Sequence, residues 1–112
     1  MENENRKNTV LCGANSYQKK YYFNPAFNKL PEQIKRELQI MCVEFTEDAG
    51  GILTLEFTPE GTLNFNVRSA DGDYLFDDIA SGMKITEYQR ERQELLQELE
   101  LFYKVVFLGY RV

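Results

Sequence analysis

The stretch from Gly50 to Arg68 constrains the fold more than any other part of this chain. Residues 52–57 and 62–68 alternate apolar and polar side chains, which is the period of a half-buried strand. Between them, Pro59 presets the first corner of a turn and Gly61 can adopt a positive φ. The pattern therefore predicts a β-hairpin that has one covered face and one face in solvent.

Two long helices are predicted to cover the apolar face of this hairpin. The first runs over 31–49, with Pro at its start, apolar residues at three- and four-residue steps, and a Gly pair at its end. The second is predicted over 84–108, where apolar side chains recur on one helical face. Thr86 and Gln89 have the spacing of a capping box near its start. An alternative makes 104–108 a terminal strand, because periodicity does not separate the two for a short apolar run.

Three other segments complete the predicted α+β domain. Residues 19–23 are rich in aromatic side chains and are predicted to form a strand, and 74–76 are a candidate third strand of a meander. Residues 1–10 are polar and have no periodicity, so we predict a disordered leader followed by one domain over 11–112. The expected fold class is α+β, a small antiparallel sheet with two long helices packed on one face.

The charge of the chain argues against two classes of partner. The 112 residues carry a net charge of −5, whereas nucleic acids and anionic membrane surfaces favour basic proteins. No apolar run approaches the ~20 residues that a membrane-spanning helix needs. The first ten residues contain no hydrophobic signal segment, so we expect a cytoplasmic location.

The residue types needed for common catalytic and metal sites are largely missing. The chain has no His, which removes the commonest general base and every His-containing triad. Two Cys are too few for a structural zinc site, and the acidic run at 71–78 does not fit a calcium loop. Cys42 is predicted on a buried helix face, while Cys12 stays a candidate reactive thiol. We predict no catalytic, cofactor-binding or metal-binding residues and no cofactor.

The end of the second predicted helix is apolar on all sides. Leu101, Val105 and Leu108 project from the same side as its acidic residues, so something outside the sheet must cover them. Tyr residues are also abundant, as they are in protein interfaces. The candidate interface residues are Tyr21, Phe23, Leu101, Val105, Phe107, Leu108 and Tyr110.

Three hypotheses of function follow from these patterns. The first is a non-enzymatic interaction domain that forms a homodimer or binds an unidentified protein. The second is a ligand-binding protein or enzyme that uses Tyr and carboxylate side chains in a cleft. The third is an accessory role on nucleic acid through a basic face around Lys19, Lys20 and Arg68.

Three segments of the chain, LCGANSYQKKYYFNP, LPEQIKRELQIMCVEFTEDAGGILTLEF and QRERQELLQELELFYKVVFL, are familiar in combination. Together they resemble a small family of uncharacterised cytoplasmic proteins from anaerobic Gram-positive bacteria. The resemblance extends from about Leu11 to Leu108 and includes no catalytic signature. It implies a single self-contained bacterial domain and leaves its activity open.

Overall fold

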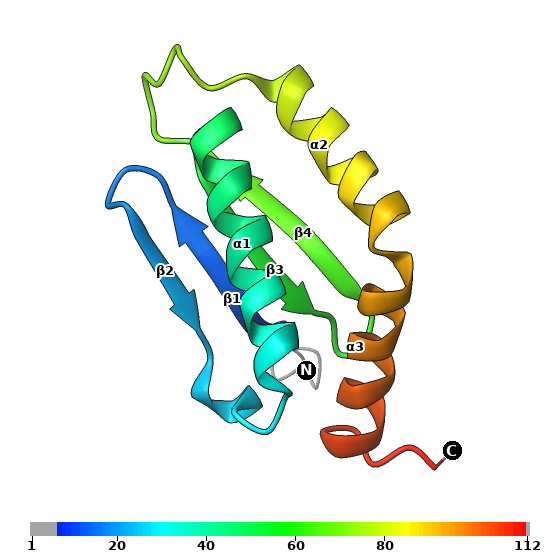
Figure 1. Cartoon of the computed structure of the whole chain (residues 1–112). Coiled ribbons are helices and arrows are strands. Elements are labelled where there is room, and N and C mark those ends of the chain that lie inside the picture. The colour runs from blue at the N-terminus through cyan, green and yellow to red at the C-terminus, as the bar shows by residue number, and fades with distance from the viewer. Residues whose placement is uncertain (1–6, 112) are drawn as a thin grey trace.

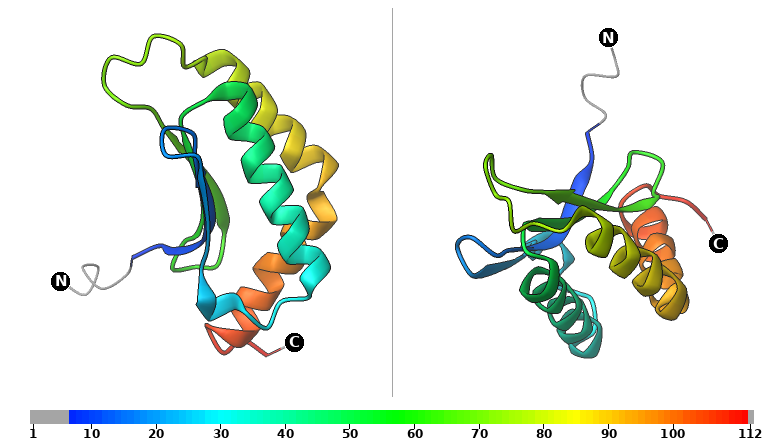
Figure 2. Two further views of the ribbon diagram at one scale, coloured as in Figure 1. Left: turned by 60° about the vertical axis from the view of Figure 1, so that its left-hand side comes forward. Right: turned by 90° about the horizontal axis from the view of Figure 1, so that it is seen from above.

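In a computed structural model, which describes residues 7–111, the chain forms a four-stranded antiparallel sheet with helices on one face. The strands are β1 (Thr9–Asn15), β2 (Lys20–Phe23), β3 (Ile52–Phe57) and β4 (Leu63–Arg68), in the order β2-β1-β3-β4. Helices α1, α2 and α3 all lie on the same side of this sheet (Figure 2). The predicted α+β class is confirmed.

The central hairpin has the predicted strands and the predicted two faces. Leu53 pairs with Val67 and Leu55 with Phe65, so their apolar side chains share the face that the helices cover. Gly61 takes the expected positive φ, 95°. The hairpin prediction succeeded because its signals, alternation and turn chemistry, are local.

Strand β1 lies between β2 and β3, and the sequence analysis missed it. Its pairing with β3 shifts register between Val10 and Cys12, and both Leu11 and Cys12 are fully buried. This irregularity breaks the two-residue period by which a strand is recognised. Thr9 and Val10, which were assigned to the leader, belong to β1, and residues 1–6 lie outside the described residues.

The first helix, α1 (Glu32–Ala49), matches its predicted span closely. Its buried stripe packs on β1 and β3, and Gly50 ends it with a φ of 81°. Before it, the single turn η2 (Pro25–Phe27) is capped by the side chain of Asn24, which accepts the N–H of Ala26. Phe27, the last residue of this turn, is fully buried in the core.

The second predicted helix is two helices, α2 (Asp78–Glu91) and α3 (Gln93–Val106). Asp77 caps α2 by accepting the N–H of Ala80, so the helix begins six residues before Lys84 and runs through Gly82. Thr86 lies inside α2, where its hydroxyl donates to the Gly82 carbonyl, so the capping-box prediction was wrong.

The chain turns at Arg92, between α2 and α3. No Pro or Gly marks this turn, and the apolar period continues across it, so sequence patterns do not reveal it. The turn lets α2 lie beside α1 while α3 reaches β4 (Figure 1).

Two short apolar segments were open questions for the sequence. The helical interpretation of 104–108 is confirmed as far as Val106, where α3 ends. The candidate strand at 74–76 was wrong, because the side chain of Asp73 accepts the N–H of Leu75 and folds this segment into a turn. Within residues 7–111, no helix is long and apolar enough to cross a membrane.

Candidate interaction surfaces

The predicted interface residues do not form one surface. Tyr21 and Phe23 lie on edge strand β2, where both are half-buried against the core. The other candidates lie at the end of α3, which packs on β4 at the opposite edge of the sheet.

An aromatic stack fixes the end of α3 to the core. Tyr103 stacks on Phe57 with 4.3 Å between ring centroids, and Phe107 stacks on Tyr103 at 5.0 Å and on Phe27 at 4.7 Å. The Tyr103 hydroxyl also lies 2.9 Å from Oγ1 of Thr9 on β1. The last turn of α3 is therefore part of the folded core as well as part of the surface.

Three side chains of this end stay open to solvent, and we call them the tail surface. Val106, Phe107 and Tyr110 are 58%, 38% and 52% exposed. Leu101 is also exposed but lies on another side of α3, while Leu108 is half-buried against the core. The tail surface therefore keeps two of the predicted candidates and adds Val106.

A second apolar surface lies at the other end of the molecule. Tyr74, Leu75, Ile79 and Met83 are 95%, 93%, 76% and 67% exposed, and we call them the head surface. It occupies the loop before α2 and the first turns of that helix, at the top of Figure 1, while the tail surface is at the bottom. A hollow of about 920 Å³, open to solvent, borders Ile79 and Met83.

The sequence analysis missed the head surface, although one signal for part of it was present. Ile79 and Met83 are one helical turn apart, on the opposite side of α2 from the buried Ser81 and Tyr88. Extending the predicted helix back through Gly82 to Asp78 would have placed both on a helix with two apolar faces. The exposure of Tyr74 and Leu75 follows only from the tertiary structure.

Hydrogen bonds hold the loop that carries Tyr74 and Leu75. The Tyr17 hydroxyl donates to Oδ2 of Asp73 at 2.5 Å and accepts the N–H of Ala70 at 2.9 Å. The bond from Tyr17 lowers the pKa of the Asp73 carboxyl, and the bond to Asp73 in turn raises the pKa of Tyr17. The head surface is therefore presented by a loop that is tied to the β1–β2 turn.

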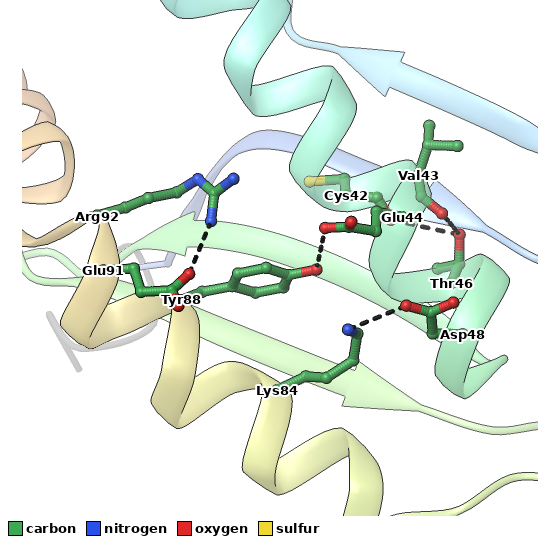
Figure 3. Close-up of polar contacts among 9 residues, drawn as sticks. All are labelled: Cys42, Val43, Glu44, Thr46, Asp48, Lys84, Tyr88, Glu91 and Arg92. Carbon is green, nitrogen blue, oxygen red and sulfur yellow. Dashed lines mark hydrogen bonds and ion pairs between the residues drawn. The ribbon is translucent and has the colours of Figure 1, made fainter.

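Contacts between α1 and α2 hold the other part of the head surface (Figure 3). The Tyr88 hydroxyl donates to Oε1 of Glu44 at 2.9 Å, and Nζ of Lys84 lies 3.0 Å from Oδ2 of Asp48. Burial raises the pKa of Tyr88, and its bond to Glu44 raises it further. These contacts fix the direction of α2, and with it the positions of Ile79 and Met83.

The profile of one protein family matches residues 8–111 of this chain. The chain belongs to DUF6145, a family of unknown function. Comparisons with curated proteins and with solved structures found no match for it. The predicted resemblance to uncharacterised proteins is confirmed at the level of this family, and the DUF6145 fold must be interpreted from its own residues.

The two cysteines of this DUF6145 protein meet inside the core, between β1 and α1. Both are free and fully buried, with 3.8 Å between the two Sγ atoms. The hydrogen bond with Cys12, followed by burial, raises the pKa of Cys42. The predicted burial of Cys42 is confirmed, and Cys12 lacks the exposure that a reactive thiol needs.

Residues 7–111 contain no group of three His, Cys, Asp or Glu side chains that could hold a metal ion. The pKa of the Asp73 carboxyl is lowered, which is opposite to the shift that suits a general acid.

Proposed function

We propose that this DUF6145 domain is a non-enzymatic protein-interaction domain that self-associates, with a homodimer as its smallest assembly. The observation that carries the proposal is the head surface, four apolar side chains that are each at least two-thirds exposed on an anchored framework. Apolar patches that the fold holds open in this way are typical of protein–protein contact sites.

The design of the head loop supports this proposal. A loop that only connects β4 to α2 can consist of polar residues without loss of stability. This loop instead exposes Tyr74 and Leu75 to solvent. Burying such side chains against a partner releases roughly 1.5–3 kcal/mol each. The bonds from Tyr17 also fix the loop before it binds, which reduces the entropy lost on association.

The alternative of a small-ligand site or enzyme has less support. A ligand site normally encloses its ligand and directs several polar groups at it, whereas the hollow beside the head surface is open to solvent. If this chain binds a small ligand, the better place is a hollow of about 550 Å³ between the β1–β2 turn and α1, which Lys20, Tyr21 and Glu47 line. We also propose a cytoplasmic location and an origin in anaerobic Gram-positive bacteria, on the basis of the resemblance. The two free thiols suit a reducing compartment.

Sedimentation velocity over roughly a hundredfold range of micromolar concentrations tests the proposal. We expect the wild-type protein to shift from monomer to larger species as concentration rises. A Tyr74→Ser, Leu75→Ser double variant should stay monomeric, while Ile40→Ser, which removes an exposed side chain from α1, should behave as wild type. Wild-type protein that stays monomeric over the whole range would remove self-association as the function.

A further inference from the structure

We propose that the contact between copies is head to tail, so that the head surface of one molecule docks on the tail surface of the next. This inference rests on the self-association proposed above and names the partner of each surface. Both surfaces are apolar, but the charges around them are opposite.

The surroundings of the head surface are acidic. Residues 69–83 contain Asp71, Asp73, Asp77 and Asp78 and no Lys or Arg. Arg68 lies one residue before this segment, and Lys84, one residue after it, is paired with Asp48 of α1. The segment that carries the head surface therefore has a local charge of one sign.

The surroundings of the tail surface are basic. Residues 101–111 contain Lys104 and Arg111 and no Asp or Glu. Lys29 adds a third positive charge, because it follows the turn of Phe27, on which Phe107 stacks. Two acidic groups lie nearby, Glu60 in the neighbouring hairpin turn and Glu100, whose carboxylate accepts the N–H of Leu63. The three cations exceed these two acids by one, so the surroundings are weakly positive.

Opposite charges favour one of the three possible pairings of these surfaces. Two heads in contact would bring together the four Asp side chains of each copy, eight in total. Two tails in contact would bring together the basic groups of both copies. Such like-charge contacts disfavour a symmetric dimer through either surface, whereas a head and a tail attract each other.

The positions of the two surfaces determine what assembly results. They lie at opposite ends of a molecule whose longest dimension is 45 Å (Figure 1). One molecule can therefore bind a neighbour at each end, which gives an open chain or a ring rather than a closed pair. The mass should keep rising with concentration instead of levelling off at a dimer.

A mixing experiment distinguishes this arrangement from a symmetric dimer. The head variant carries Tyr74→Ser and Leu75→Ser, and the tail variant carries Val106→Ser and Tyr110→Ser; all four side chains are exposed, so both variants should fold. Circular dichroism checks folding, and Ile40→Ser serves as the control. We expect each variant alone to be monomeric, because each lacks one partner surface.

An equimolar mixture should then form a 1:1 heterodimer, since the intact head of one variant meets the intact tail of the other. Association of wild-type protein should weaken by about tenfold or more between roughly 50 and 500 mM salt. The inference is overturned if one variant alone still dimerises, or if the mixture stays monomeric while wild type associates. Monomeric wild-type protein would instead refute the proposed self-association itself.

Discussion

The two ends of the molecule expose similar side chains but are built differently. At the tail, Phe107 continues an aromatic stack that runs through Tyr103 into the core. At the head, Tyr74 and Leu75 project from a loop that is held by hydrogen bonds between Tyr17 and the loop residues Ala70 and Asp73. Substitutions in the aromatic stack behind the tail surface should therefore impair folding, whereas Tyr74 and Leu75 at the head can change without loss of the fold.

The largest effect should come from the inner part of the tail. Tyr103→Ala removes a buried ring that stacks on Phe57, so we expect a loss of about 3–5 kcal/mol in the free energy of unfolding. Urea denaturation measures this loss. Tyr110→Ala, which changes an exposed residue of the same segment, should change it by no more than about 0.5 kcal/mol. Equal effects of the two changes would contradict the distinction between inner stack and outer surface.

The base of the head loop is the next most sensitive point. Gly51 has a φ of 75°, and a Cβ there would lie 2.8 Å from the Arg68 carbonyl oxygen and 2.8 Å from the Phe76 ring. We expect Gly51→Ala to reduce the free energy of unfolding by about 1–3 kcal/mol and to displace Phe76. The matched change Gly72→Ala also has positive φ but open space around it, so it should cost less in the same denaturation assay. The reverse order would contradict the crowding of Gly51 by the Arg68 carbonyl and the Phe76 ring.

A smaller effect is expected at the contact between α1 and α2. Tyr88→Phe removes the hydrogen bond to Glu44 and should reduce the free energy of unfolding by about 1 kcal/mol. Thermal unfolding measures this loss, and Tyr22→Phe is the control because Tyr22 is exposed on β2. If both variants match wild type, the bond to Glu44 does not hold α2 in place.

The smallest effect should be that of Tyr17→Phe, and it should depend on pH. Tyr17 lowers the pKa of Asp73 from its ordinary value of 3.8, so the ionised carboxylate stabilises the fold above that pH. The contribution is lost as the pH falls through the folded-state pKa. We therefore expect the variant to be less stable than wild type near neutral pH, and the difference to shrink as the pH falls through the folded-state pKa of Asp73. The part of the difference that comes from the lost bond to the Ala70 N–H should stay the same at every pH. A difference that does not change with pH would contradict this role of Asp73.

The sequence predicted those parts of the fold whose signals are local. The β3–β4 hairpin and α1 were correct because turn residues, alternation and a Gly pair mark them directly. Strand β1 was missed because its irregular pairing near Cys12 hides the strand period. Helix α2 was placed too late because its first turns include Gly82, a residue of low helix propensity.

The candidate surfaces were harder to predict than the fold. Only part of the tail surface was among the predicted residues. Phe107 and Tyr110 are exposed as part of it, whereas Leu108 is half-buried against the core and the exposed Val106 was not predicted. The head was missed because Tyr74 and Leu75 look like part of a strand, and because Tyr17, which bonds to their loop, is distant in the sequence. The contact between the free thiols of Cys12 and Cys42 likewise joins β1 to α1, and no local sequence pattern predicts it.

Hydrogen–deuterium exchange of the wild-type protein at low and high concentration tests the central claim most directly, because it needs no substitution. The account predicts that exchange slows at high concentration in two separate segments, 69–83 and 101–111, and stays the same along β2 and the outer side of α1. Slower exchange in only one of these segments, or in neither, would contradict a contact between the head of one copy and the tail of another.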